Sequence, residues 1–350
     1  MVSPGTRNSI GFSFYGFNVR MTASDPVRLS DIAVDFSYFR TSVPGKTQTP
    51  DLEIHFYDSA SRPPMPRLPA AQHTPRNVVF RDKEISYLDY GGRALARISE
   101  KGKKIEVYSD DRHLAHEAAY LTILSYTGQY FDRTGRTRVH ALGLETGGRA
   151  VLLMLPSSGG KTTMALNMLQ RDGVKLISED SPLMRRDGLI EPFPIRIGVR
   201  PGTVFPDVPD SFLLDIQRME FGPKKLIDIE FFSDRISGPV PISAILLGTR
   251  FSAGDSSIKQ IARRHAFRPL VSDAVVGLGL YQGIEFVLQS SAFELMGKGR
   301  LACSRLRNCM GCLRRATVHR FEMGTDIEQT AETLAKFLKE IAAKHESVGT

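Results

Sequence analysis

The chain has 350 residues, of which 41% are hydrophobic and 24% are charged. These fractions are typical of globular proteins and exclude a disordered chain, a collagen-like repeat and a coiled-coil rod. Lys and Arg number 46 and Asp and Glu 38, so the net charge of +8 favours anionic ligands without indicating a nucleic-acid partner. Three cysteines are too few for a disulfide framework.

The length predicts two domains, because about 150 residues are typical of one domain. The first residues, MVSPGTRNSIGFSFYGF, lack the basic and apolar segments of a signal peptide. No apolar run reaches the roughly 18 residues that are needed to span a bilayer. We therefore expect a cytoplasmic protein with no membrane partner.

The first hundred residues contain short stretches of alternating apolar and polar side chains, separated by Gly, Pro or Asp. This alternation predicts strands over 10–19, 32–39, 52–57, 78–80, 85–88, 94–98 and 104–108. The prolines between residues 62 and 76 indicate a loop. Residues 1–110 are thus predicted to form a smaller, β-rich N-terminal domain, which by fold-level analogy would recognise a substrate or a partner.

The hydrophobic period changes after residue 110, where apolar residues at helical spacing predict a helix over 114–130. The elements predicted downstream are strands over 139–144 and 149–155, a helix over 162–170, strands over 174–178, 242–247 and 284–288, and a helix from 327 to about 345. The order strand, loop, helix, strand is typical of a parallel βαβ unit. Residues 111–350 are therefore predicted to form an α/β domain, which makes the whole chain a mixed α/β protein.

The loop between the strand over 149–155 and the helix over 162–170 has the composition of a phosphate-binding loop. It reads Pro-Ser-Ser-Gly-Gly-Lys-Thr-Thr from residue 156 to 163. Small residues let backbone amides curl around phosphate oxygens, and the helix adds the positive end of its dipole. Lys161 would then reach the β and γ phosphates, and the Thr162 hydroxyl would bind Mg²⁺. The alternative is a glycine-rich turn with an exposed lysine and no ligand.

One position departs from the usual motif, which would have Gly where this chain has Leu155. A positive φ at that position would cost a leucine about 1–2 kcal/mol.

Two carboxylates, Glu179 and Asp180, follow the strand over 174–178. Ligands of α/β sheets gather where parallel strands end, so we expect this pair near the loop, at the end of an adjacent parallel strand. One carboxylate would bind Mg²⁺ and the other would accept the proton of an attacking hydroxyl. His140 precedes the loop, and its position alone favours a structural histidine over a functional one.

The order of these segments resembles the HPr kinase/phosphorylase-like P-loop kinases. The residues that carry the resemblance are Val139-His140-Ala141, the loop through Thr163, and Leu176-Ile177-Ser178-Glu179-Asp180, within about residues 138–202. The resemblance implies a nucleotide core similar to that of phosphoenolpyruvate carboxykinase. A β-rich domain ahead of this core is typical of relatives from peptide-maturation cassettes, such as the SynChlorMet cassette, which the segment 276–286 also resembles.

The resemblance implies a role for each matching residue. The residues implied to contact ATP are Ser157, Ser158, Gly159, Gly160, Lys161, Thr162 and Thr163. Thr162 and Asp180 would hold Mg²⁺. Glu179 would act as the catalytic base with help from His140, although the family usually has Asp at this position and Gly in place of Leu155 and Ser158. The chain lacks the family's phosphorylase signature, so a kinase without phosphorolysis is expected.

Other basic residues offer further candidates. Arg196, Arg200, Lys224 and Lys225 could neutralise phosphate charge, and Arg200 is the favoured one. The basic stretch 298–320 holds all three thiols and a histidine, which would be zinc ligands in one interpretation: Cys303, Cys309, Cys312 and His319. In a second interpretation the stretch is a basic loop that binds an acidic peptide, and in a third it is solvated charge. Its lack of aromatic residues argues against nucleic acid.

The sequence therefore favours an ATP- and Mg²⁺-dependent kinase that acts on a Ser or Thr hydroxyl of a peptide or small protein. Two alternatives stay open: a nucleotide-binding accessory protein that has lost phosphoryl transfer, and a peptide-binding scaffold with a vestigial loop. The sequence does not decide between ATP and GTP or fix the oligomeric state, and a homo-oligomer remains open.

Overall fold

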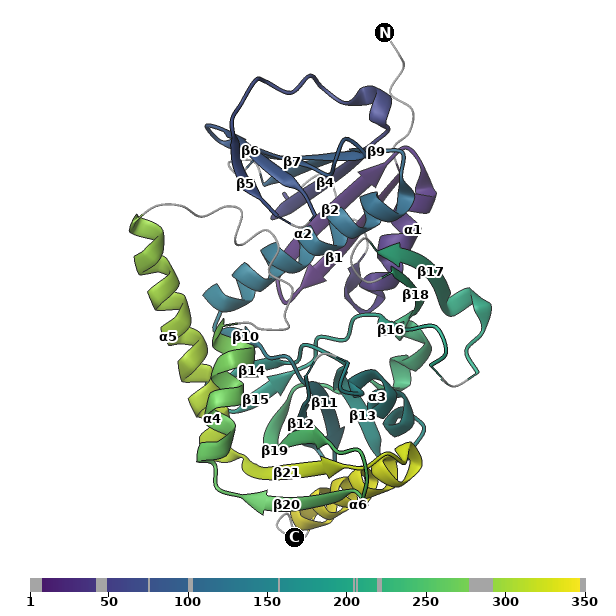
Figure 1. Ribbon diagram of the computed structural model, residues 1–350, viewed down its shortest axis with the longest axis vertical. Helices are drawn as coiled ribbons and strands as arrows, with labels where there is room; N and C mark the ends of the chain where they lie inside the picture. The colour runs from purple at the N-terminus through teal and green to yellow at the C-terminus, as the bar shows by residue number, and fades with distance from the viewer. Residues whose placement is uncertain are drawn as a thin grey trace.

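The computed structural model describes residues 8–41, 49–74, 76–99, 103–156, 158–203, 205, 207–218, 222–276 and 292–346. Ser157, the predicted strand over 284–288 and residues 277–286 lie outside the described residues. The described chain is a mixed α/β protein with two large sheets (Figure 1), which confirms the predicted class.

The N-terminal half is built on a nine-stranded sheet within the described residues. Its strands are β1 (Asn8–Phe14), β2 (Phe17–Ala23), β3 (Arg40–Thr41), β4 (Leu52–Tyr57), β5 (Ala70–His73), β6 (Val78–Asp82), β7 (Ile85–Asp89), β8 (Ala94–Ser99) and β9 (Lys104–Ser109). Their order across the sheet is β3-β1-β2-β4-β9-β8-β7-β6-β5. Two helices, α1 (Pro26–Asp35) and α2 (Arg112–Arg133), pack against this sheet, and α2 crosses the molecule between its upper and lower parts (Figure 1).

Two predictions for this half were wrong. The predicted strand over 32–39 is the end of α1 followed by a 3₁₀ turn, Ser37–Phe39. Asp25 caps α1 by accepting from the amide of Val27, and a proline opens the helix, so local capping overrides the apolar pattern. The predicted strand over 10–19 is a hairpin that turns at Tyr15 and Gly16, both with positive φ. The predicted loop over 62–76 also contains the short strand β5.

The second sheet also has nine strands within the described residues. They are β10 (Arg136–Arg138), β11 (Leu142–Thr146), β12 (Arg149–Met154), β13 (Val174–Ser178), β14 (Leu183–Arg185), β15 (Leu189–Glu191), β19 (Val240–Arg250), β20 (Ser257–Ile261) and β21 (Thr317–Met323). The main path runs β10-β14-β15-β19-β12-β11-β13, and β21 joins β19 to β20. A smaller sheet holds β16 (Ile197–Val199), β17 (Leu213–Arg218) and β18 (Gly222–Ile227).

The order of the strands corrects one expectation. β12 and β13 run in the same direction, but they are not adjacent, because β11 lies between them and is antiparallel to both. The parallel neighbour of β12 is β19.

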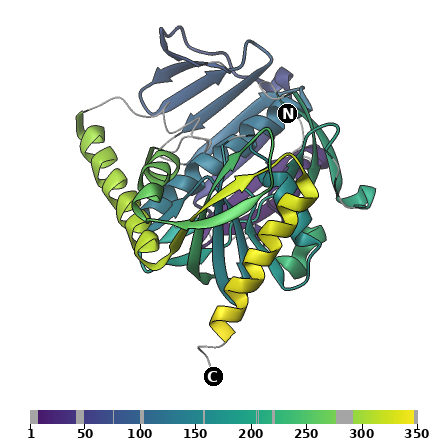
Figure 2. The same cartoon turned by 60° about the horizontal axis from the view of Figure 1, so that its bottom comes forward.

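Helices cover both faces of the second sheet. Alternate residues of β12 point to opposite faces, so Val151 and Leu153 belong to one core cluster and Leu152 and Met154 to another. The first cluster includes α3 (Lys161–Leu169) and α6 (Ile327–Glu346). The second includes α4 (Arg264–Leu270) and α5 (Ala292–Arg315), and Figure 2 shows α5 and α6 apart from each other. The predicted helices at α2, α3 and α6 and the strand β13 are confirmed.

The basic stretch 298–320 is not a loop. Its residues form most of α5 and the first part of β21. The two halves of the chain also share a core, because Leu183, Phe193 and Ile195 pack in the same cluster as the phenylalanines of β1 and Phe36, which follows α1.

Candidate functional site

The ends of three neighbouring strands bring the candidate residues together. The carboxyl ends of β12 and β13 and the amino end of β11 lie at one edge of the sheet, because β11 runs opposite to its neighbours. Lys161 follows β12 after the loop, Glu179 and Asp180 follow β13, and His140 precedes β11. Residues that are far apart in sequence therefore meet at this edge.

The backbone of the loop after β12 is not strained at Leu155, the position where the sequence departs from the usual phosphate-binding motif. Leu155 is buried, its φ is not positive, and its side chain fills the space beside Gly248 on β19. The positive φ values fall instead on Ser158 (64°) and Gly160 (101°). At Gly159 a β-carbon would lie 2.8 Å from the carbonyl oxygen of Pro156, so only glycine fits that turn.

The amino end of α3 faces the loop without a side-chain cap. Gly160 occupies the N-cap position and offers no side chain to accept from the first amides. The amides of Lys161, Thr162 and Thr163 belong to the first turn, where an α-helix supplies no acceptor. This end can therefore receive an anion, with the helix dipole in the favourable direction.

Lys161 is buried at the centre of a short polar chain. Its Nζ lies 2.7 Å from Nε2 of His140, 2.9 Å from the carbonyl oxygen of Leu155 and 3.8 Å from Oδ1 of Asp180. Nδ1 of His140 lies 3.0 Å from the same carboxylate oxygen. An ammonium can only donate, so Nε2 of His140 accepts from Lys161, while Nδ1 faces the Asp180 carboxylate. Burial lowers the pKa of Lys161, while Asp180 and Glu179 act in the opposite direction.

The two carboxylates have different partners and different proton affinities. The Thr162 hydroxyl donates to Oε1 of Glu179 at 2.5 Å, whereas Asp180 binds His140. Burial and the neighbouring Asp180 raise the pKa of Glu179 to about 7. Burial also acts to raise the pKa of Asp180, but the His140 hydrogen bond and nearby positive charges hold it below its ordinary value. His140 thus contacts Asp180, and not Glu179 as the sequence suggested.

Basic residues extend the site on the side of the small sheet. Arg200 donates to the Ser158 hydroxyl at 3.0 Å, which places it against the loop as expected. Lys224 lies near both carboxylates, and its pKa is lowered by burial and by Arg196 and Arg200. A cavity of about 460 Å³ adjoins them, with Arg200, Lys224 and the apolar side chains of Val199 and Ile216 in its wall.

Two of the basic candidates have other partners. Arg196 is buried, pairs with Asp35 at 2.5 Å and lies over the Tyr120 ring, so it joins β16 to the N-terminal helices. Lys225 is half-buried and pairs with Asp215.

A metal would find oxygen donors here, but no preformed cage. Among the described residues no group of three or more His, Cys, Asp or Glu side chains is arranged to hold a metal ion. Mg²⁺ keeps several waters and uses one or two carboxylates with substrate phosphates, so the Thr162 hydroxyl and Asp180 fit its needs.

The predicted zinc site is wrong. Cys309 and Cys312 are buried on α5, where burial raises the pKa of each thiol to about 12, and Cys303 is exposed. Among the described residues these cysteines and His319 do not come together as a group of three or more ligands that could hold a metal ion.

One nearby carboxylate was missed by sequence reasoning. Asp273 lies in a π-helical turn, Val271–Val276, and the charges of His140 and Lys161 act on it. Burial raises its pKa. Nothing in its sequence surroundings marks it, because the fold alone brings it to this site.

Comparison with known proteins does not assign the chain. No family model matches the sequence, and no curated protein is significantly similar to it. In the part of the chain that the structure describes, no helix is both long and apolar enough to cross a membrane.

Proposed function

We propose that the chain is an ATP- and Mg²⁺-dependent kinase that phosphorylates a Ser or Thr hydroxyl of a peptide or small protein, with a P-loop core of the HPr kinase type. The observation that supports this proposal most is that four functional groups lie close together. A buried lysine, a threonine hydroxyl and two carboxylates of unlike pKa meet beside the uncapped end of α3. A phosphoryl-transfer site needs these groups in this proximity.

The loop and α3 would bind the polyphosphate. The first-turn amides donate to phosphate oxygens, and Ser158 and Gly160 already have the left-handed conformation that turns the loop. The Lys161 ammonium now donates to the carbonyl oxygens of Leu155 and Pro156, and it would exchange these neutral acceptors for phosphate. Arg200, which donates to the Ser158 hydroxyl, would add a second positive charge beside the loop.

The two carboxylates would divide the chemistry. A base works best when its pKa is near the working pH, which suits Glu179 at about 7. Asp180 stays ionised and, with the Thr162 oxygen, would hold Mg²⁺, which neutralises charge on the transferring group. The Thr162 hydroxyl can donate its proton to Glu179 while its lone pairs remain free for the metal.

Transfer then follows as one displacement. A new bond forms between the acceptor oxygen and the γ-phosphorus while the bond to the β,γ-bridging oxygen breaks, and ADP leaves with that electron pair. Glu179 accepts the hydroxyl proton. His140 holds Asp180 on one side and Lys161 on the other, so it positions both charged groups.

Radiolabel transfer tests the proposal. The native chain, the Glu179→Gln variant and a Glu340→Gln control are each incubated with γ-labelled ATP, Mg²⁺ and Ser- or Thr-containing peptides. Glu340 is an exposed residue of α6. We expect labelled peptide with the native chain and the control, and a loss of at least about a hundredfold with Glu179→Gln. Label that stays in ATP with every peptide, although ATP binds, would contradict the kinase.

A nucleotide-binding accessory protein is the second candidate. Lys161 and Thr162 both have protein acceptors within the site, which is an arrangement compatible with binding alone. ATP binding without transfer would select it, and absence of binding to ATP and GTP would select the peptide-binding scaffold.

A further inference from the structure

Two neighbouring cavities on the face formed by α5 and the β14–β15 hairpin share part of their lining. Their volumes are about 500 Å³ and 470 Å³, and Arg186 and Arg315 line both. The arginines that line the two cavities, here called the arginine groove, are Arg136, Arg185, Arg186, Arg307, Arg314 and Arg315. Asp187 is the acidic residue in the lining. The groove lies away from the loop site, because β19 and β15 separate β12 from β14 in the sheet.

Close packing fixes the shape of this groove. A β-carbon at Gly311 on α5 would lie 2.0 Å from the Arg186 carbonyl oxygen, so glycine lets the helix touch the hairpin. The hairpin turn at Gly188 is covered by the Arg315 side chain, which would lie 2.4 Å from a β-carbon there. The Arg315 guanidinium also donates to the Gly311 carbonyl oxygen at 2.9 Å. The groove is therefore held by the backbone and not by exposed side chains alone.

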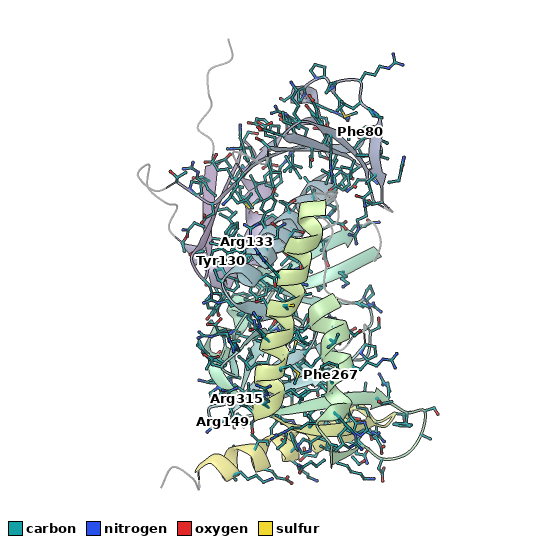
Figure 3. All side chains as sticks on the ribbon, turned by 90° about the vertical axis from the view of Figure 1, so that its left-hand side faces the viewer. Phe80, Tyr130, Arg133, Arg149, Phe267 and Arg315 are labelled. Atoms are coloured by element: carbon teal, nitrogen blue, oxygen red, sulfur yellow. The ribbon has the colours of Figure 1, made fainter. Side chains whose placement is uncertain are left out.

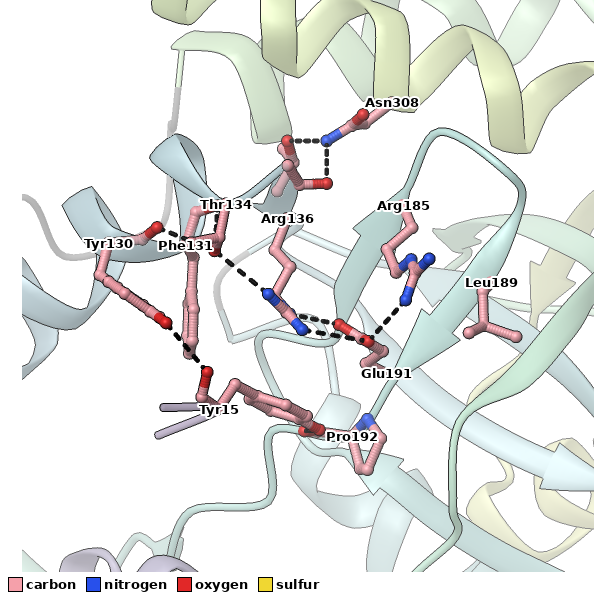
Figure 4. Close-up of polar contacts among 12 residues, drawn as sticks. Tyr15, Tyr130, Phe131, Thr134, Arg136, Arg185, Leu189, Glu191, Pro192 and Asn308 are labelled. Carbon is pink, nitrogen blue, oxygen red and sulfur yellow. Dashed lines mark hydrogen bonds and ion pairs between the residues drawn. The ribbon is translucent and has the colours of Figure 1, made fainter. Parts of the chain in front are cut away.

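The arginines at one end of the groove are already neutralised. Figure 4 shows Glu191 between Arg136 and Arg185, and the structure gives N–O distances of 2.6 Å and 3.1 Å for the two pairs. Arg185 also pairs with Asp187 at 2.8 Å. These contacts hold the floor of the groove in place.

Three arginines at the other end of the groove carry positive charges that no carboxylate of the described residues compensates. Among the described residues, the guanidinium groups of Arg186, Arg307 and Arg314 have no hydrogen-bonding or ion-pair partner. All three side chains are exposed. Arg133, at the end of α2, lies on the same face as Arg315 (Figure 3) and adds another exposed positive charge.

We propose that the arginine groove binds an acidic segment of a partner polypeptide. Planar guanidinium groups pair with carboxylates through two parallel hydrogen bonds, and the basic residues among the described lining are all arginines. Leu306 and Met310 line it as well and can receive apolar side chains between the acidic ones. None of the described residues that line the two cavities is aromatic, so they do not provide the base stacking that single-stranded nucleic acid needs. The proposal does not depend on the kinase activity.

Fluorescence anisotropy with the full chain tests the proposal. The probe is a fluorescein-labelled peptide of repeated Glu-Glu-Leu units, with a labelled oligothymidylate as the nucleic-acid comparison. The test variant combines Arg186→Glu, Arg307→Glu and Arg314→Glu. The control combines Lys259→Glu, Lys336→Glu and Lys339→Glu, which makes the same charge change at exposed sites elsewhere.

We expect the native chain and the control to bind the peptide and the test variant to bind it at least about tenfold more weakly. Absence of binding to the native chain, or an equal loss in both variants, would overturn the proposal. Tighter binding of the oligothymidylate, lost in the test variant, would replace it with nucleic-acid binding. If the triple variant does not fold, Arg314→Gln at one exposed position gives the same comparison with Lys339→Gln.

Discussion

Replacing Glu179 by Gln should stabilise the protein at alkaline pH. The amide oxygen of Gln can still accept from Thr162, so the variant removes the buried charge and keeps the hydrogen bond. A folded-state pKa of about 7 against an ordinary 4.5 corresponds to about 3 kcal/mol at most. Glu179 is half-buried, and solvent screening reduces the expected gain to about 1–2 kcal/mol.

The sign of this effect follows from proton binding. Between pH 4.5 and 7 the folded state keeps the Glu179 proton while the unfolded state loses it, so the native protein loses stability as pH rises. The Glu179→Gln variant does not lose stability in this way, because its amide does not titrate. Urea unfolding at about pH 4.5 and about pH 8 should therefore show nearly equal stabilities at the lower pH and a more stable variant at the higher one.

The control is Glu340→Gln on the exposed surface of α6, which should leave the free energy of unfolding unchanged at both pH values. A Glu179→Gln variant that is less stable than the native chain at about pH 8 would refute the reasoning, since it would show that the ionised carboxylate is well accommodated.

Three further substitutions test the structure around the site. Ser158→Gly relieves the positive φ and should raise the free energy of unfolding by about 0.5 kcal/mol in urea, even though it loses the Arg200 contact; a loss above about 1 kcal/mol would contradict this. Leu155→Gly restores the usual motif residue but empties a core position, so we expect a loss of about 3 kcal/mol, and an unchanged midpoint would show that Leu155 is not packed as described. Arg196→Met removes the guanidinium that pairs with the buried Asp35 carboxylate and leaves His116, at 2.7 Å, as its other ion-pair neighbour, so we expect a loss of about 3 kcal/mol in urea; an unchanged free energy of unfolding would argue against the ion pair.

Local signals explain the elements that the sequence predicted well. β13 and α6 match their predicted starts, and α3 differs by one residue at each end, because strand composition, helical spacing and the glycine pair act within a few residues. The interposition of β11 between β12 and β13 has no local signal, since strand order depends on contacts between distant segments. The strand predicted over 32–39 failed because its apolar spacing also suits a capped helix.

The candidate site likewise contains residues that local sequence signals predict and contacts that only the fold shows. The loop and the carboxylate pair could be found by motif, whereas the links from His140 to Lys161 and Asp180 required the fold. The zinc interpretation failed because it ignored helical phase. Cys309 and Cys312 share the buried side of α5, but a six-residue separation turns Cys303 to another side.

Calorimetric titration of ATP with Mg²⁺ tests the central claim, polyphosphate binding by the loop at the end of β12, most directly. We compare the native chain with Lys161→Met, which keeps the buried aliphatic stem, and with Lys175→Met, an exposed lysine on β13. The account predicts binding by the native chain and by Lys175→Met, and at least about tenfold weaker binding by Lys161→Met. A native chain that binds neither ATP nor GTP, or a Lys161→Met variant that binds as tightly as the native chain, would contradict it.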